Sequence, residues 1–379
     1  MKIIALCFPG TEDICATEIR ELCGVDSSQH ESAVIFELNE AKVLNYCYMS
    51  QTPTKVLGFL GMLKFNSLEE ILDYVKKIKL IGWTNKNTTF KVKCTRSGEH
   101  KFSSETIMQE VGEIFYEKDQ LKVDLDNPEI LIYVYIHDNN CYIGIDLTLL
   151  DLSKRDYKMF SSAETIKGPI AYSMVRIADY NEKDVLLNPA TGSGAIEIEA
   201  ALFMLQKSVN FYRKNKFCFE RLLPFKETFY EGYFDELDNI KTCKLKIYGY
   251  ASLLSHVKYA QKNAKIAGVD KDIHNTKIDI EWLDTKFEKQ TVNKLVTYLP
   301  CPSKRRSEHE IIKIYKELFY QIEYILNQNG LFVALTQKNE LLKKMAEENK
   351  LRMIHERIIM QGKTKFWLNV FEKQASSKK

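Results

Sequence analysis

The amino-acid sequence predicts an α/β protein with an α+β N-terminal part. In the C-terminal half, Val185, Leu186 and Leu187 form an apolar run typical of a buried strand, and from Ala195 the apolar residues recur at helical spacing. In the N-terminal half, short apolar runs with period-two alternation are interleaved with amphipathic segments. The chain has 379 residues, of which 45% are hydrophobic and 28% charged, a size and composition typical of a globular protein with two or three domains.

Composition excludes several classes of protein. The formal net charge of +3 is too small to indicate a nucleic-acid binder, so such a function would depend on local patches. The nine cysteines form no Cys-x-x-Cys pair, which argues against a disulfide framework or a zinc knuckle, and we expect no metal. Residues 1–10 end their apolar run at Pro9-Gly10 and are interpreted as a first strand rather than a signal peptide. No run approaches the roughly 18 apolar residues of a membrane span, and we expect a cytoplasmic protein.

The N-terminal elements follow from periodicity and capping signals. Thr11 is the expected N-cap of the first helix, and Asn66-Ser67 opens a helix whose apolar residues mark one face. The expected strands are 2–8, 32–38, 55–63, 89–98, 129–137 and 141–147, and the expected helices are 11–23, 40–49, 66–80 and 103–117.

The C-terminal half continues as alternating strands and helices. Residues 159–180 lead into a helix, and Gly268 is the expected end of the helix that follows the second strand. The expected strands are 185–187, 245–250, 278–284, 294–298, 330–336, 352–359 and 365–372, with a helix at 308–327 and a polar, disordered tail at 374–379.

The turn Gly192-Ser193-Gly194 separates the strand at 185–187 from its helix. Two glycines allow positive φ and let the backbone pass close to a ligand, and the amide groups at the helix start favour an electron-rich or anionic group. The third glycine of a dinucleotide fingerprint and the Gly-Lys-Ser/Thr of a triphosphate site are absent. A tight turn without a ligand is the alternative interpretation.

Longer motifs carry a resemblance to a known family. Asn-Pro-x-x-Gly-Ser-Gly-x-Ile-x-Ile-Glu-Ala-Ala, at 188–201, resembles the first S-adenosylmethionine motif of Rossmann-like methyltransferases. Phe-x-Val-x-x-x-Arg-x-Gly-x-His-x-Phe (90–102), Val-Asp-Leu-x-Asn-Pro (123–128), Tyr-Ile-Gly-Ile-Asp (142–146) and Leu-x-Lys-Arg-x-Tyr (152–157) resemble the THUMP domain. Together they resemble the THUMP-containing guanine-N2 methyltransferases of tRNA and rRNA, in particular the branch that modifies the tRNA acceptor stem near position 6.

This resemblance implies a domain plan, a cofactor and partners. The implied domains are an N-terminal ferredoxin-like part at 1–65, a THUMP RNA-binding domain at 66–158, a linker at 159–180 and a Rossmann-like class I methyltransferase domain at 181–373. The last would have a mostly parallel seven-stranded sheet. The cofactor would be S-adenosyl-L-methionine, the substrate tRNA, and a further partner a small zinc-binding activator protein.

The resemblance also assigns roles to residues. The implied cofactor-binding residues are Asn188, Pro189, Ala190, Thr191, Gly192, Ser193, Gly194, Ala251, Ser252 and Asp284, and the implied catalytic residues are Tyr298, Leu299, Pro300 and Cys301. Asn188 stands where the family has Asp, Ala251 where it has an acidic residue, Tyr298 where it has Asn or Asp, and Cys301 where it has a stacking aromatic residue. Each lost hydrogen bond to the cofactor would cost about 1–3 kcal/mol. A helix N-cap is an equal interpretation of Asp284.

RNA binding would depend on basic residues spread over the chain. The candidates are Arg96, His100, Lys101, Lys154, Arg155, Lys158, Lys304, Arg305 and Arg306, which would neutralise phosphates without reading sequence. Ordinary surface charge is the alternative for each. The insertion at 205–242 interleaves basic and aromatic residues, and either stacks on unpaired bases or forms an amphipathic helical hairpin packed on the sheet.

Three functions compete at this stage. The first is S-adenosylmethionine-dependent methylation of guanine N2 in tRNA. The second is a catalytically inactive paralogue that binds tRNA as a non-enzymatic or regulatory protein. The third is a protein whose basic and aromatic residues are ordinary surface and which binds no RNA, in which case no salt-dependent complex with tRNA would form.

Overall fold

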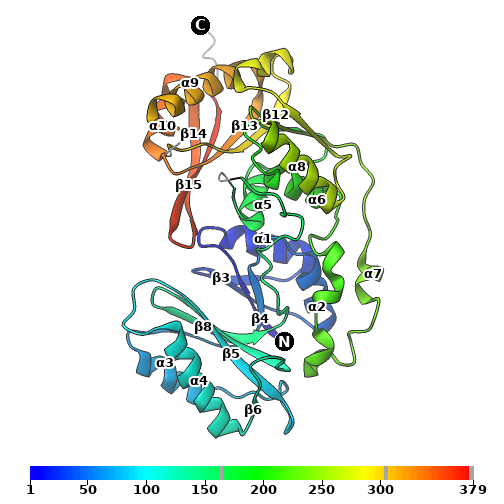
Figure 1. Ribbon diagram of the computed structural model, residues 1–379, viewed down its shortest axis with the longest axis vertical. Helices are drawn as coiled ribbons and strands as arrows, with labels where there is room; N and C mark the ends of the chain where they lie inside the picture. Colours follow the sequence, from blue (N-terminus) through cyan, green and yellow to red (C-terminus); the bar gives the residue numbers. More distant parts are fainter. Residues whose placement is uncertain (163–164, 303–305, 375–379) are drawn as a thin grey trace. The chain divides into compact units, whose positions relative to one another are not determined.

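The computed structural model describes residues 1–162, 165–302 and 306–374, and the chain divides into two compact units. Unit 1 comprises Met1–Leu152 and Arg213–Asp238, and unit 2 comprises Ser153–Tyr212 and Asn239–Lys379. Each unit has its own β-sheet (Figure 1). Lys304, Arg305 and most of the predicted tail lie outside the described residues. Among the described residues, no helix has both the length and the apolar character needed to cross a membrane.

Unit 1 contains an eight-stranded sheet in the order β2-β3-β1-β4-β8-β7-β5-β6. Its strands are β1 (Lys2–Leu6), β2 (Ser27–His30), β3 (Ala33–Glu37), β4 (Lys55–Lys64), β5 (Thr89–Ser97), β6 (Lys122–Val123), β7 (Ile130–His137) and β8 (Asn140–Asp146). Its helices before residue 152 are α1 (Glu12–Cys23), α2 (Glu40–Met49), α3 (Leu68–Lys77) and α4 (Ser104–Asp119). The sequence missed only the short strands β2 and β6, which lack an apolar run.

Side-chain caps start three of the four helices of this region. The side chains of Asn39, Ser67 and Ser103 accept hydrogen bonds from backbone amides of α2, α3 and α4, respectively. Thr11 makes no such cap, because its hydroxyl donates to the Phe8 carbonyl at 2.7 Å. Helices α3 and α4 contact each other, and α4 packs on β5 (Figure 1).

The segment 213–238 packs into the core of unit 1. It forms 3-10 turns and the short helix α7 (Tyr233–Leu237). Phe217, Phe219, Leu222, Phe225 and Phe234 are all at most 3% exposed, and they belong to the same apolar cluster as β1, β3 and α2. The helical hairpin expected as one alternative is not formed by the described residues of this segment. Phe217 and Phe219 are inaccessible to bases, whereas Tyr212 of the same insertion is 61% exposed, so base stacking by Tyr212 stays a prediction.

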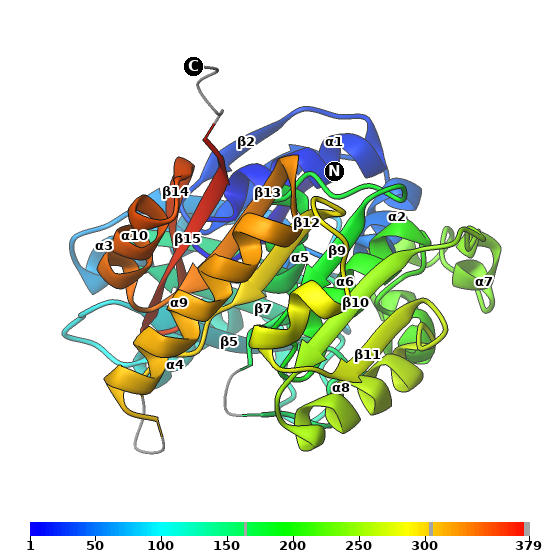
Figure 2. The same ribbon diagram turned by 90° about the horizontal axis from the view of Figure 1, so that it is seen from above.

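Unit 2 contains a seven-stranded sheet in the order β11-β10-β9-β12-β13-β15-β14, in which β15 runs antiparallel to the other strands. The predicted mostly parallel class I methyltransferase sheet is thereby confirmed. Its strands are β9 (Val185–Asn188), β10 (Lys246–Ala251), β11 (Ile273–Lys277), β12 (Val292–Tyr298), β13 (Leu326–Thr336), β14 (Leu351–Gln361) and β15 (Thr364–Lys373). Its helices are α5 (Gly168–Ile177), α6 (Ala195–Met204), α8 (Leu254–Ala267), α9 (Glu308–Ile325) and α10 (Asn339–Glu348). Helices α9 and α10 lie together over the sheet (Figure 2).

The predicted third strand at 278–284 is wrong. The strand that pairs with β10 is β11, which ends at Lys277, and residues Ile280–Thr285 form a 3-10 turn. Because β11 is an edge strand, it carries polar His274, Asn275 and Thr276 and lacks the apolar run of a central strand. The sequence also missed α10.

Candidate active site

The glycine turn between β9 and α6 is fixed by hydrogen bonds to neighbouring elements. Gly192 and Gly194 have φ of 56° and 84°, the left-handed region that favours glycine. The Thr191 amide donates to the Tyr250 carbonyl at 2.8 Å, which joins the turn to the end of β10. The Asn263 side chain donates to the Ser193 carbonyl at 2.9 Å, which joins it to α8. The turn is therefore held from both sides.

A cavity of about 400 Å³ lies beside this turn, at the carboxyl ends of the parallel strands. This is the edge of an open α/β sheet at which ligands bind. The cavity is lined by Pro189 and Ala190 after β9, Ala251, Ser252 and His256 after β10, Asp279, Ile280 and Glu281 after β11, Pro300 after β12, and Arg306, Glu310, Lys313, Ile314 and Glu317 at α9.

The structure brings together some of the predicted cofactor-binding residues and separates others. Pro189, Ala190, Ala251 and Ser252 line the cavity. Asn188, Thr191 and Ser193 are at most 5% exposed and support the turn from behind.

Asp284 does not line the cavity. Its side chain is exposed and its amide donates to the Gln321 side chain at 2.9 Å, whereas Asp279 lines the cavity instead. Asp279 was not predicted from the sequence, because the third strand was expected at 278–284 and lies at Ile273–Lys277. A strand ending at Lys277 would have put Asp279 at the carboxyl edge of the sheet, where the cavity lies.

The four residues predicted to be catalytic lie at the end of β12, which closes with Tyr298, and in the loop that follows it. The Tyr298 hydroxyl accepts a hydrogen bond from the Gln337 side chain at 3.1 Å, and the Tyr298 ring meets Phe366 edge-on. Leu299 is 1% exposed, and Pro300 lines the cavity. The buried Tyr315 hydroxyl lies 3.2 Å from the Pro300 carbonyl, to which it can donate.

Cys301 completes this loop. Its thiol donates to the Leu299 carbonyl at 3.7 Å. These contacts fix the backbone carbonyls of the loop beside the cavity, and they give Cys301 a local structural contact although it cannot stack on a base.

Two of the predicted RNA-binding residues are committed to internal contacts. Arg155 is 4% exposed and forms a bidentate pair with Glu199, with Nε–Oε1 and Nη2–Oε2 distances of 2.7 and 3.1 Å. The Tyr157 hydroxyl donates to the same carboxylate at 2.7 Å. The Lys158 ammonium donates to the Ile166 carbonyl, and burial lowers the pKa of Lys158 to about 8. We therefore remove Arg155 and Lys158 from the phosphate-binding set, and Lys154 remains exposed.

Three predicted RNA-binding residues lie in unit 1, where Arg96 and His100 form a packed cluster. Arg96 Nη1 donates to His100 Nδ1 at 2.9 Å, and His100 Nε2 donates to the Asp138 carbonyl at 2.7 Å. The His100 ring also stacks on Phe102, with ring centroids 5.1 Å apart. Lys101, beside them in the chain, is exposed.

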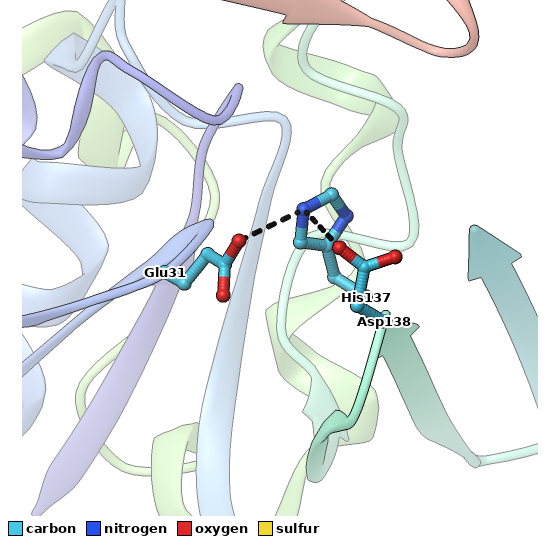
Figure 3. Close-up of side chains that lie close together, drawn as sticks. All are labelled: Glu31, His137 and Asp138. Atoms are coloured by element: carbon cyan, nitrogen blue, oxygen red, sulfur yellow. Dashed lines mark ion pairs between the residues drawn. The ribbon is translucent and has the colours of Figure 1, made fainter. Parts of the chain in front are cut away.

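Glu31, His137 and Asp138 form a further polar cluster in unit 1 (Figure 3). His137 Nε2 lies 3.5 Å from Glu31 Oε1 and 3.8 Å from Asp138 Oδ2. The other ring nitrogen of His137 is hydrogen-bonded to Ser97 Oγ at 2.7 Å. The side chains of Glu31 and Asp138 are 53% and 63% exposed, so the cluster is a solvated group of polar side chains at the surface.

The chain is similar to known protein families and to proteins of known name. Residues 155–366 match the family described as RMKL-like, methyltransferase domain, and residues 65–146 match the THUMP domain. The chain is 28% identical over 371 residues to a tRNA (guanine(6)-N2)-methyltransferase of Methanocaldococcus jannaschii, covering 93% of this chain and 95% of that one. It is 26% identical over 373 residues to an enzyme of the same name from Archaeoglobus fulgidus, covering 96% and 90%.

Two solved structures share the fold along nearly the whole chain. One is SMU.472, a putative methyltransferase complexed with SAH, with a TM-score of 0.80, 19% identity and 99% of both chains covered. The other is TrmN from Thermus thermophilus, with a TM-score of 0.68, 21% identity, and 98% and 99% covered. These agree with the resemblance predicted from the sequence. Because the methyltransferase match alone spans more than half of the chain, the protein belongs to the RMKL-like methyltransferase family and carries a THUMP domain.

Proposed function

We propose that the protein transfers a methyl group from S-adenosyl-L-methionine to the N2 atom of a guanine in tRNA, at position 6 of the acceptor stem. The observation that carries this proposal is the similarity to the archaeal enzymes of that name, which extends over at least 93% of this chain rather than over one domain. The alternative of an inactive paralogue has no support in these comparisons. The cavity beside the glycine turn supplies a site for the chemistry.

The residues of the cavity fit an adenosyl cofactor. Its volume of about 400 Å³ lies in the range of small-molecule sites. Ala251 offers no side-chain acceptor for the ribose hydroxyls, but the carboxylates of Asp279 and Glu281 line the same cavity. We assign the polar contacts with the adenosine to these two residues and to Ser252, and we replace Asp284 by Asp279 in the predicted set.

The proposed nucleophile, the N2 amine of guanine, is weak. An exocyclic guanine amine has its lone pair delocalised into the ring, so the enzyme must orient the nitrogen and accept its protons. The bound cofactor supplies an electrophilic methyl group on a sulfonium. The acceptors in the chain are the backbone carbonyls of Tyr298 and Leu299 and the Tyr298 hydroxyl, and the contact between Tyr315 and Pro300 keeps the loop after β12 in place.

The accessible basic residues among the predicted set would make the contacts with RNA. We assign phosphate binding to Lys101 and Lys154, which are exposed, and to Arg306 at the cavity. The packed pair Arg96 and His100 belongs to the same THUMP motif and supports Lys101. Lys304 and Arg305 lie outside the described residues and remain predictions, as do the activator protein and the cytoplasmic location.

Calorimetric titration with S-adenosylhomocysteine and a methyl-transfer assay with unmodified tRNA test this proposal together. We expect the wild type to bind the ligand and to methylate tRNA. Tyr298→Phe removes the acceptor oxygen but keeps the ring on Phe366, and we expect about a 100-fold lower transfer rate with unchanged ligand affinity. Tyr298→Asn restores an acceptor oxygen and should retain more activity than Tyr298→Phe. A wild type that neither binds the ligand nor transfers methyl groups would contradict the proposal.

A further inference from the structure

Glu197 is a buried carboxyl group at the start of the helix that follows the glycine turn. It lies in the first turn of α6 and its side chain is fully buried. Within the described part of the chain, neither of its carboxylate oxygens has a hydrogen-bond partner of good geometry, although Thr191 and Asn188 lie close enough to act on it. An ionised carboxylate in such surroundings is strongly unfavourable, because burial removes its hydration without replacing it.

Two other unpartnered oxygens lie beside Glu197. A Cβ atom added to Gly249 would lie 2.4 Å from Asn275 Oδ1, 2.6 Å from Glu197 Oε1 and 3.0 Å from Thr191 Oγ1, so the three oxygens converge on the Gly249 backbone. Thr191 Oγ1 and Asn275 Oδ1 are also buried and make no hydrogen bond to any described residue. A side chain at 249 would have to displace these atoms, so the glycine leaves room for the arrangement.

The protonation state of Glu197 depends on how many hydrogen atoms are available for hydrogen bonds among these three oxygens. With the Asn275 amide oriented as it is, its Oδ1 only accepts, and an ionised Glu197 only accepts, so among these three oxygens the Thr191 hydroxyl carries the one hydrogen. A protonated Glu197 supplies a second. The group can then form hydrogen bonds without a buried charge.

We infer that Glu197 acts as a protonated positioning residue, which holds the glycine turn in its cofactor-binding shape by donating a hydrogen bond to Thr191 or Asn275. The inference rests on the proposed function, because the turn matters only if the adjoining cavity binds the cofactor. It also accounts for Asn188: an Asp at this position would bring a second acid to a site that already holds Glu197.

The groups around Glu197 agree with a neutral carboxyl. The side chains that act on Glu197, Asn188 from β9 and Thr191 from the turn, are uncharged, and so is Asn275 from β11 beside it. Burial raises the pKa of Glu197 to about 7, although Thr191, the backbone and Asn188 act to lower it. The nearby titratable group Tyr157 has its own pKa raised by burial and by acidic neighbours that include Glu197, and Glu199 is held by Arg155.

The turn connects Glu197 to the cavity. Pro189 and Ala190 line the cavity directly before Thr191 in the chain, and the Thr191 amide binds the Tyr250 carbonyl directly before Ala251. Ionisation of Glu197 removes the donor that orients Thr191. Cofactor affinity should therefore fall as the pH rises through the neutral range.

Titration of S-adenosylhomocysteine into the wild type, Glu197→Gln and Glu197→Leu, at about pH 6 and about pH 8.5, tests this inference. For the wild type we expect a loss of affinity of about tenfold, the equivalent of one hydrogen bond. Gln has the same shape and a permanent donor, so Glu197→Gln should change by less than about twofold. Glu197→Leu has no donor and should bind weakly at both pH values. Glu182→Gln, an exposed carboxyl of unit 2, is the matched control and should follow the wild type.

The outcomes separate this inference from the proposed function. If Glu197→Gln loses affinity with pH as the wild type does, Glu197 is not the titrating group and the inference fails while the proposed function stands. If the affinity of the wild type does not change with pH, the inference also fails while the proposed function stands. A wild type that does not bind at about pH 6 would contradict the proposed function itself.

Discussion

Arg155 and Glu199 form a buried ion pair that Tyr157 completes with a hydrogen bond. Both charged side chains are inaccessible, and the three polar groups satisfy one another. A buried pair of this kind contributes little net stability compared with apolar residues, but removal of one partner leaves an uncompensated charge. The role of Arg155 is therefore to anchor the entry into unit 2.

Replacement of Arg155 tests this role. We expect Arg155→Ala to lower the free energy of unfolding by about 3–5 kcal/mol, because Glu199 would remain buried without its partner. Urea unfolding followed by circular dichroism measures the change. The exposed Lys183 provides a control, since Lys183→Ala should change stability by less than about 0.5 kcal/mol. Equal effects of the two substitutions would contradict the structural role.

Because Glu197 titrates near neutral pH, the free energy of unfolding should depend on pH, as cofactor binding does. Its folded-state pKa of about 7 lies above the ordinary value of 4.5, so the folded chain binds more protons between these values. The stabilising effect is complete below the ordinary pKa and is lost as the pH rises through the folded-state pKa. We expect the wild type to lose up to about 3 kcal/mol relative to Glu197→Gln over this interval, measured by urea unfolding without cofactor. A constant difference between the two proteins would exclude this titration.

At the scale of elements, the segment 213–238 interrupts unit 2 in sequence but belongs to unit 1 in space. Phe234 stacks on Tyr48 with ring centroids 4.6 Å apart, and the Tyr48 hydroxyl donates to Asp238 at 2.7 Å. The alternation of basic and aromatic residues suggested a nucleic-acid contact because the sequence does not say which rings are buried. The rings of Phe217, Phe219, Phe225 and Phe234 fill the core, whereas Tyr230 remains at the surface of the segment.

A large-to-small substitution in this segment tests its structural role. Phe234→Ala should destabilise unit 1 by about 3–5 kcal/mol, because it removes a ring that is 3% exposed and leaves a cavity. Tyr230→Ala, at a ring that is 47% exposed, should cost less than about 1 kcal/mol. Thermal unfolding of both variants distinguishes the two positions. An undisturbed Phe234→Ala protein would contradict the assignment of this segment to the core.

At the scale of the whole molecule, the sequence predicts central elements better than edges. The buried strands β9, β10 and β12 carry apolar runs, so their positions along the chain and that of the glycine turn could be predicted. The edge strand β11 is polar, and its misplacement moved the predicted acidic residue from Asp279 to Asp284. Burial is the second limit, because neither the motif at 152–157, which contains Arg155, nor Lys158 directly after it shows which basic side chains face inward.

Binding of tRNA should depend on salt in proportion to the phosphates neutralised. If Lys101 contacts one phosphate, Lys101→Ala should reduce the slope of log K against log salt concentration by about 0.7–0.9 and leave the affinity for S-adenosylhomocysteine unchanged. Fluorescence anisotropy with labelled tRNA measures both slopes. Lys86→Ala removes another exposed lysine of unit 1, one that lies outside the motif at 90–102, and should leave the slope as in the wild type. Equal slopes for all three proteins would remove Lys101 from the interface.

The central claim is that the cavity beside the glycine turn serves methyl transfer to guanine N2 at position 6 of tRNA, the nucleotide in the name of the archaeal relatives. Nucleoside mass spectrometry tests it directly on two synthetic tRNAs that differ only at this nucleotide, one with guanine and one with inosine, which lacks the N2 amine. The account predicts N2-methylguanosine in the first tRNA and no methylation in the second. Equal methylation of both, or a methyl group on another base, would contradict it.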